Sequence, residues 1–271
     1  MQNALIVLAI VFYLISTIYF SIRFFLKKAK MRTLAFLFLL LGFFTHGLNL
    51  LVFALEQHRF PAASFVEASG TLTWLILLLF LLFSRRSEMD AAGVALLPVT
   101  VVSLLIGAFA PEPSNASIQP MIKGGWIYVH TPLMILSVAS LTISFVMALM
   151  YLLQEKQLKS KHPAFLYYRL PSLEICEDYV YKSLGLGFFL LTFGIVTGMI
   201  WSKYLRNVYW SWDIKEVWAV ITWGLYAILI QGRMLAAWRG RKAAYLAIIG
   251  FALILFTFAG VSLLSKGYHT F

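Results

Sequence analysis

Apolar segments long enough to cross a lipid bilayer recur along the whole of this 271-residue chain. A transmembrane helix needs roughly 20 predominantly apolar residues. Only 12% of the residues are charged, about half the share found in soluble domains. Eight such segments lie between polar breakers, at about 3–25, 33–55, 70–84 (extending back toward Phe65), 92–110, 126–153, 183–203, 214–236 and 243–264. The sequence therefore predicts an all-α polytopic membrane protein, a bundle of about eight transmembrane helices forming one domain over residues 1–271.

Lys and Arg are unevenly divided between the connections at the two ends of these segments. Six lie at one end, namely Arg59, Lys123, Lys203, Arg206, Lys215 and Lys266. Fifteen lie at the other, namely Lys27, Lys28, Lys30, Arg32, Arg85, Arg86, Lys156, Lys159, Lys161, Arg169, Lys182, Arg233, Arg239, Arg241 and Lys242. Cytoplasmic loops carry the excess of Lys and Arg, so we expect the fifteen to be cytoplasmic and both chain termini to lie on the outer side.

A Trp-rich stretch, VYWSWDIKEVWAVITW at 208–223, holds four of the eight Trp residues of the chain. In the expected topology it lies outside, between the sixth and seventh segments. His130 lies about one turn into the fifth segment from its outer end, and His269 lies just beyond the outer end of the eighth. Two imidazoles can ligate a haem iron axially, and indole rings can supply an apolar floor for the porphyrin. Four cations of the same side could pair with haem propionates: Lys203, Arg206, Lys215 and Lys266.

A plainer interpretation of the Trp-rich stretch stays open. Trp and Tyr gather at membrane interfaces in membrane proteins generally. Asp213, three residues before Glu216, predicts an N-cap and a partial capping box at the start of the seventh helix. Trp218 and Trp223 would then be packing residues inside that helix.

Four further features lie outside this stretch. His46 lies within the second segment, where an imidazole is a functional candidate, or else makes a helix–helix hydrogen bond to Asn49 or a Thr. Closely spaced glycines in the sixth segment predict close helix packing: Gly185, Gly187, Gly194 and Gly198. The single cysteine, Cys176, excludes a disulfide framework and a Cys-pair metal site, and the absence of C-x-x-C-H excludes covalently attached haem. The net charge of +11 is explained by topology and lipid headgroups, so no nucleic-acid partner is expected.

The stretch WSWDIKEVWAVITWGLYAILIQGR resembles the WWD segment of the CcsA (ResC) family of system II cytochrome c biogenesis, here at about 201–223. VHTPLMILSVASL and GVSLLSKGYHTF are similar to the contexts of that family's two external His residues, and FVEASGTLTW is similar to an upstream family segment. Three positions depart from the pattern: Ile214 stands where the family has Pro, Val217 where it has Thr, and Gln231 where it has an intramembrane haem-ligating His.

The resemblance implies a haem-binding protein of the cell's inner or plasma membrane that presents non-covalent, b-type haem at its extracytoplasmic face. His130 and His269 would be the axial ligands of the iron, and the expected cradle comprises Trp210, Trp212, Asp213 and Trp218, with Lys215 and His46 as further haem contacts. The implied partners are haem, a CcsB (ResB)-like membrane protein and apocytochrome c. No catalytic side chain is expected, and the chain would be a haem delivery subunit or part of a holocytochrome c synthase complex that acts by proximity.

A second interpretation comes from a different functional class. Length and the segments FFTHGLNL and WRGRK are also similar to HemX-type and YpjD-type relatives. HemX proteins regulate tetrapyrrole synthesis through glutamyl-tRNA reductase. In that case the polar connection 154–182 would carry the regulatory surface.

Overall fold

The computed structural model describes residues 2–84, 89–109, 125–160, 165–236 and 238–257. Its α-helices are α1 (Gln2–Leu26), α2 (Ala29–Gln57), α3 (Phe65–Phe83), α4 (Asp90–Phe109), α6 (Ile127–Lys159), α7 (Leu173–Arg206), α8 (Ile214–Ala236) and α9 (Arg241–Leu255). A short 3-10 helix, η2 (Phe165–Tyr168), lies between α6 and α7.

Each of the eight predicted segments coincides with one of these helices, which confirms the all-α architecture. Six of the helices, α1, α2, α3, α6, α7 and α8, are long and apolar enough to cross a membrane, a count made over the described ranges. The chain is therefore a multi-pass membrane protein. The number of eight crossings, the outer placement of both termini and the single domain over 1–271 stay predictions.

The connection between α6 and α7 is shorter than predicted. The stretch 154–182 was expected to be a polar loop, but α6 continues to Lys159 and α7 begins at Leu173. Ser172 caps the start of α7 with its hydroxyl, and the first turn buries Cys176 completely. Helix extends into this charged stretch because one face of it is apolar and packs inward.

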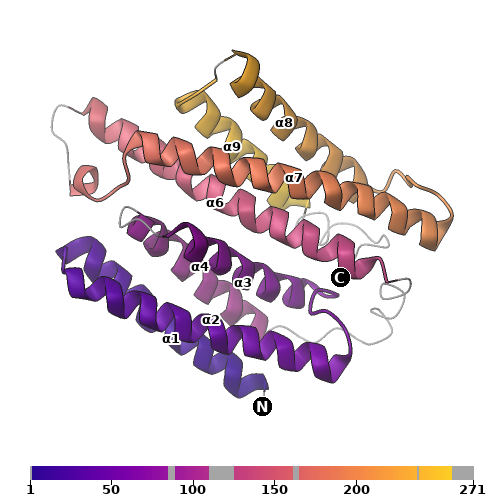
Figure 1. Ribbon diagram of the computed structural model, residues 1–271, viewed down its shortest axis with the longest axis horizontal. Helices are drawn as coiled ribbons and strands as arrows, with labels where there is room; N and C mark the ends of the chain where they lie inside the picture. The colour runs from indigo at the N-terminus through magenta and orange to yellow at the C-terminus, as the bar shows by residue number, and fades with distance from the viewer. Residues whose placement is uncertain (1, 85–88, 110–124, 161–164, 237, 258–271) are drawn as a thin grey trace.

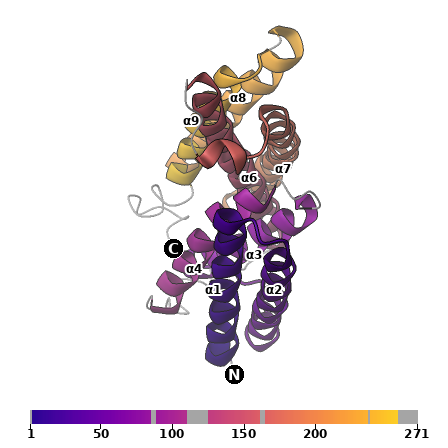
Figure 2. The same ribbon diagram turned by 90° about the vertical axis from the view of Figure 1, so that its left-hand side faces the viewer.

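The helices form two groups, α1–α4 and α6–α9, drawn in purple and in pink to yellow in Figure 1. Figure 2 shows the same division after a quarter turn. The two groups meet mainly where α3 packs on α6, and α6 also contacts α7 and α9. Helix α6 is therefore the central element of the fold. Two thirds of the residues in its most apolar stretch are buried.

The interface between α6 and α7 is polar in part and very close. Three hydroxyls of α6 donate to backbone carbonyls of α7: Ser137 to Gly187 at 2.7 Å, Ser140 to Ser183 at 2.7 Å and Ser144 to Val180 at 3.1 Å. A side chain at Gly187 would collide with Leu141, which confirms that this glycine lets the two backbones approach. The expectation for Gly185 was wrong, because nothing lies within 4 Å of the place where its Cβ would be.

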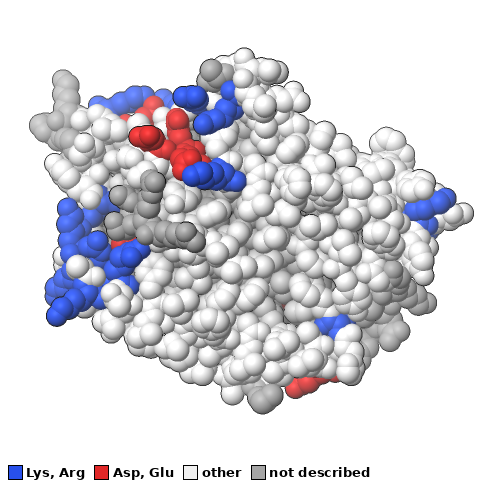
Figure 3. Space-filling view, in the orientation of Figure 1, with Lys and Arg blue, Asp and Glu red and all other residues white. Residues whose placement is uncertain are grey.

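Basic residues gather at one end of the helices. Figure 3 shows most of the visible Lys and Arg at one end of the molecule, where Asp and Glu residues lie among them. A hydrogen bond from Arg169 to the Phe25 carbonyl at 2.8 Å joins the connection between α6 and α7 to the last turn of α1. The grouping follows the predicted division of the connections, and it is the arrangement that the positive-inside rule expects of a cytoplasmic end.

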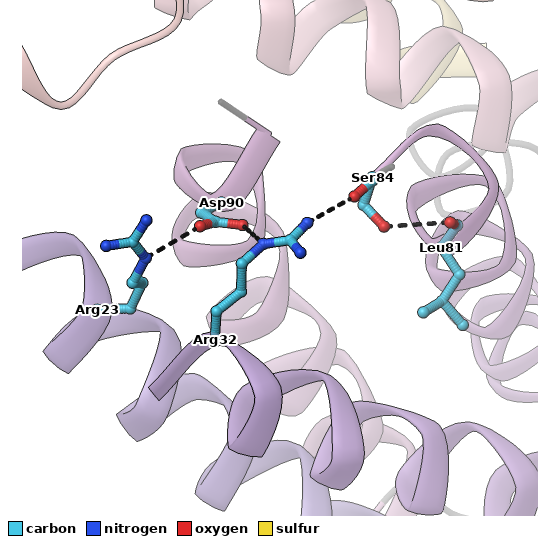
Figure 4. Close-up of polar contacts among 5 residues, drawn as sticks. All are labelled: Arg23, Arg32, Leu81, Ser84 and Asp90. Atoms are coloured by element: carbon cyan, nitrogen blue, oxygen red, sulfur yellow. Dashed lines mark hydrogen bonds and ion pairs between the residues drawn. The ribbon is translucent and has the colours of Figure 1, made fainter. Parts of the chain in front are cut away.

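A buried carboxylate joins three helices at this same end. Asp90, at the start of α4, lies between Arg23 of α1 at 3.3 Å and Arg32 of α2 at 2.9 Å, as Figure 4 shows. Arg32 also donates to the Ser84 carbonyl at 3.0 Å, just after α3. The network ties the ends of α1, α2, α3 and α4 together. These contacts of Asp90 were not predicted from the sequence.

Candidate functional site

His130 lies in the first turn of α6, as predicted, and its ring is held against α7. Its Nδ1 lies 2.8 Å from the Gly194 carbonyl oxygen. A carbonyl oxygen only accepts, so Nδ1 carries the proton and Nε2 of the neutral ring holds a lone pair. The residue is partly exposed. A metal-ligating His commonly donates its other N–H to a carbonyl in this way, so the geometry of His130 fits an iron ligand.

His130 meets the WWD segment at its first residue. The rings of His130 and Trp201 have centroids 5.7 Å apart and are inclined by 34°. Trp201 is 6% exposed and lies on α7, seven residues beyond Gly194. The structure therefore brings His130 and the start of the WWD segment together, although Trp201 was not among the predicted site residues.

The connection between α7 and α8 carries the Trp-rich motif and is held by side chains. Asn207 ends α7 in the left-handed conformation, with φ of 58°. Arg206 donates to the Ser211 hydroxyl at 2.7 Å, and Glu216 accepts from the Ser211 hydroxyl and backbone N–H, both at 2.8 Å. These bonds fasten the short connection to both flanking helices.

The start of α8 confirms one half of the capping prediction. Asp213 precedes the helix and its Oδ1 accepts from the Lys215 backbone N–H at 2.9 Å, as an N-cap residue does. The capping box was wrong, because the Glu216 carboxylate turns to Ser211 and Arg206 instead of the Asp213 backbone. The Glu216 carboxylate instead bonds Ser211 in the connection and pairs with the Arg206 guanidinium.

The four Trp residues of the motif divide into two kinds. Trp210 and Trp212 lie edge to face, with centroids 6.0 Å apart, and Trp212 is 78% exposed. Trp218 packs against Phe256 of the last described turn. Trp223 points inward and donates to the Thr192 hydroxyl at 2.9 Å. Trp223 is thus a packing residue, as the plainer interpretation expected, while Trp212 is displayed.

The backbone at Trp212 is unusual. Its φ is +58°, a left-handed conformation that a bulky side chain seldom adopts. Such strain of about 1–3 kcal/mol persists where the surroundings over-determine the conformation, often at functional sites. Here the bonds of Ser211 on one side and the Asp213 cap on the other hold the backbone of Trp212.

His46 lies in the other group of helices, about three turns before the end of α2. It is 1% exposed, and its Nδ1 lies 3.4 Å from the hydroxyl of Tyr13 on α1. The hydrogen-bond partner across helices is therefore Tyr13 and not Asn49 or a Thr. A haem contact at His46 stays a prediction.

Two predicted residues fall outside the part of the chain that the structure describes: His269 and Lys266. Of the other expected cations, Lys203 lies in the last turn of α7, where its Nζ donates to the Asn207 carbonyl at 3.0 Å, and Lys215 lies in the first turn of α8. Both stand beside the connection that carries Trp210 and Trp212.

One feature at this end was missed by the sequence analysis. Arg59 and Glu67 form a two-pronged ion pair, at 2.5 and 2.8 Å, in which each side chain is only 10% exposed. Glu67 also accepts from the Ala63 backbone N–H at 2.9 Å. The segment FVEASGTLTW, noted for its resemblance, thus supplies the carboxylate that closes the connection between α2 and α3.

Comparison with known proteins adds a family. Residues 34–269 match the family described as Cytochrome C assembly protein. The chain is 32% identical to the cytochrome c biogenesis protein CcsA of Guillardia theta over 238 residues, covering 80% of this chain and 78% of that protein. It is 30% identical to the CcsA protein of Microcystis aeruginosa over 267 residues, covering 80% of each. These relatives confirm the resemblance to CcsA and give no support to the HemX-type interpretation.

A solved structure has the same fold. Cytochrome c heme lyase CcmF superposes over 97% of this chain with a TM-score of 0.63 and 19% sequence identity. The chain spans 45% of the length of that protein. The likeness at this identity concerns the arrangement of the helices.

Proposed function

The chain belongs to the Cytochrome C assembly protein family, and we propose that it acts in cytochrome c biogenesis by binding haem and presenting it for attachment to apocytochrome c. The haem would be b-type and non-covalent, with the iron ligated by His130 and His269. The proposed cradle is the WWD segment, through Trp210, Trp212, Asp213 and Trp218.

The observation that carries this proposal is the state of His130. Its Nδ1–H is committed to the Gly194 carbonyl, so the lone pair of the neutral ring is on Nε2. A His that ligates iron commonly has its other ring nitrogen held by a carbonyl in this way, which fixes the tautomer and the orientation of the ring. The ring also lies beside Trp201, where the WWD segment begins.

The displayed indole of Trp212 supports the cradle. The indole of Trp212 is exposed and stands on a strained backbone. Packing a flat, apolar porphyrin against it would bury this apolar surface, which is favourable. Lys203, in the last turn of α7, and Lys215, in the first turn of α8, flank the connection that bears Trp212. Their ammonium groups could form charge-assisted hydrogen bonds with propionates.

When bound, haem would supply its two vinyl groups, and each would take up one cysteine thiol of apocytochrome c, the sulfur bonding to one vinyl carbon and the proton going to the other. The residues of this chain would contribute position. His130 would hold the iron relative to α6 and α7, and the connection, bonded to α7 and α8, would hold the Trp surface. Holding two reactants in attacking geometry can supply much of the rate without a side-chain acid or base. The protein with its bound haem would thus be a haem delivery subunit, or it would be part of a holocytochrome c synthase complex. In either case its partner would be a CcsB-like membrane protein.

The proposed location is the cell's inner or plasma membrane, with the WWD segment on the extracytoplasmic face. The charge asymmetry supports this orientation, because the end opposite the WWD segment holds most of the Lys and Arg of the described connections. Apocytochromes c would then meet the site on the side where Trp212 is displayed.

The function is tested in cells that depend on this chain for c-type cytochromes. His130→Ala is expected to lower covalently bound haem in those cytochromes by ~10-fold or more, because removing even the outer partner of a metal-ligating His typically costs that much. His58→Asn is the matched control, because His58 is exposed, lies in the connection after α2 and has a left-handed backbone that Asn tolerates. Normal cytochrome levels with His130→Ala would rule the proposal out.

A further inference from the structure

We propose that Gly194 and Gly198 of α7 are positioning residues that decide which nitrogen of His130 faces the iron. The inference deepens the proposed function and depends on His130 being a ligand. It concerns how a ligand on α6 is oriented by the backbone of a neighbouring helix.

Gly194 acts through its carbonyl. The oxygen accepts from Nδ1 of His130 at 2.8 Å and from the Thr197 hydroxyl at 3.0 Å. Because the oxygen cannot donate, the imidazole must present a protonated Nδ1 to it, and the lone pair of the neutral ring is then on Nε2. The hydrogen bond therefore selects one tautomer and one ring orientation.

Gly198, one turn later, acts through its missing side chain. A Cβ at this position would lie 2.9 Å from Cε1 and 3.0 Å from Nδ1 of His130. Contacts this short would force the ring away from α7 and stretch the bond to Gly194. The ring can reach the carbonyl only because residue 198 has no Cβ.

Trp201 limits the ring from a further direction, with centroids 5.7 Å apart. The ring of His130 is thus confined by three residues within the last turns of α7. The same helix leads directly into the connection that bears Trp210 and Trp212. Helix α7 therefore positions both the ring of His130, which comes from α6, and the connection that carries the cradle residues. A site with defined geometry needs such a rigid support.

The test uses the full-length, haem-free protein with ring-15N-labelled histidine, observed by NMR in detergent or nanodiscs. The signal of His130 is the one that disappears in His130→Gln. Wild type is expected to show the neutral tautomer protonated at Nδ1, and Gly198→Ala is expected to lose it or to show a mixture. Gly185→Ala is the matched control, because it adds the same methyl to the same helix in open space.

Haem titration followed at the Soret band supplies the second measurement. Gly198→Ala is expected to weaken haem binding by ~10-fold or more, as loss of the outer partner of a ligating His does, and Gly185→Ala is expected to leave it unchanged. A wild-type ring protonated at Nε2 would overturn the positioning role, and this measurement needs no variant to fold. An unchanged tautomer and affinity in Gly198→Ala would overturn it too. If the tautomer responds as expected but His130→Gln binds haem normally, the proposed function fails and the orientation of the ring serves no ligand.

Discussion

Arg206, at the end of α7, and Glu216, in the first turn of α8, bond to the same Ser211 hydroxyl, one as donor at 2.7 Å and the other as acceptor at 2.8 Å. Their side chains are only 20% and 14% exposed. The connection between the helices is therefore fastened at its midpoint, directly between Trp210 and Trp212.

Glu216→Gln is expected to loosen the connection without unfolding the helices. The change removes the charge opposite Arg206 and weakens two bonds to Ser211, at a cost of about 1–3 kcal/mol in the free energy of unfolding. Haem affinity should fall while helical circular dichroism stays the same. Glu56→Gln, an exposed carboxylate at the end of α2, is the control. Equal haem affinity in the two variants would show that the connection is not part of the site.

Trp212→Gly separates stability from binding. Glycine adopts a φ of +58° freely, so thermal stability should be kept or slightly raised although a large side chain is lost. Haem affinity should fall, because the displayed indole is gone. Trp223→Ala, by contrast, removes a packed ring and its bond to Thr192, and should cost roughly 3 kcal/mol of stability. If Trp212→Gly bound haem as wild type does, Trp212 would be an interface residue only.

His46→Leu is expected to destabilise the protein but to leave the axial ligation of the haem iron, and therefore the low-spin haem spectrum, intact. The change leaves the buried Tyr13 hydroxyl without its partner, a loss of about 1–3 kcal/mol, which thermal unfolding would detect. Adding Tyr13→Phe should restore most of that loss, because both polar groups are then absent. A haem spectrum that is lost with His46→Leu and not recovered with Tyr13→Phe would instead make His46 a ligand.

Asp90→Asn tests the network at the opposite end. The change leaves Arg23 and Arg32 without their shared carboxylate, and the partial burial of both guanidinium groups makes a loss of about 2 kcal/mol reasonable. Asp178→Asn breaks an exposed pair with Lys182 and should cost under about 1 kcal/mol. Indistinguishable melting temperatures for the two variants would contradict a structural role for Asp90.

Much of the fold could be read from the sequence because hydropathy is a strong and local signal. Each of the eight segments became a helix, and the N-cap at Asp213 was visible from its spacing to the apolar run. The extent of α6 and α7 could not be read in the same way. Their charged ends looked like loop, since amphipathic helix beyond a membrane span carries few apolar residues to mark it.

The candidate site was harder to derive, because its contacts join distant parts of the chain. His130 was identified as a candidate, but its partner Gly194 lies 64 residues away and contributes only backbone. The spacing of Gly194 and Gly198 in the sixth segment, now α7, indicated close packing. It does not show whether the group packed against these glycines is a helix backbone or an imidazole ring. The pairing of Arg59 with Glu67 and the shared use of Ser211 likewise depend on how the connections fold.

The most direct test of haem binding beside the WWD segment is the visible absorption spectrum of the purified protein with haem supplied. Wild type and the His130→Ala/His269→Ala double variant would be compared in the oxidised and reduced states. We predict a Soret band with sharp low-spin bands on reduction in wild type, lost in the double variant, because both axial ligands are then removed. An unchanged spectrum in the double variant, or no band in either protein, would contradict the proposed site.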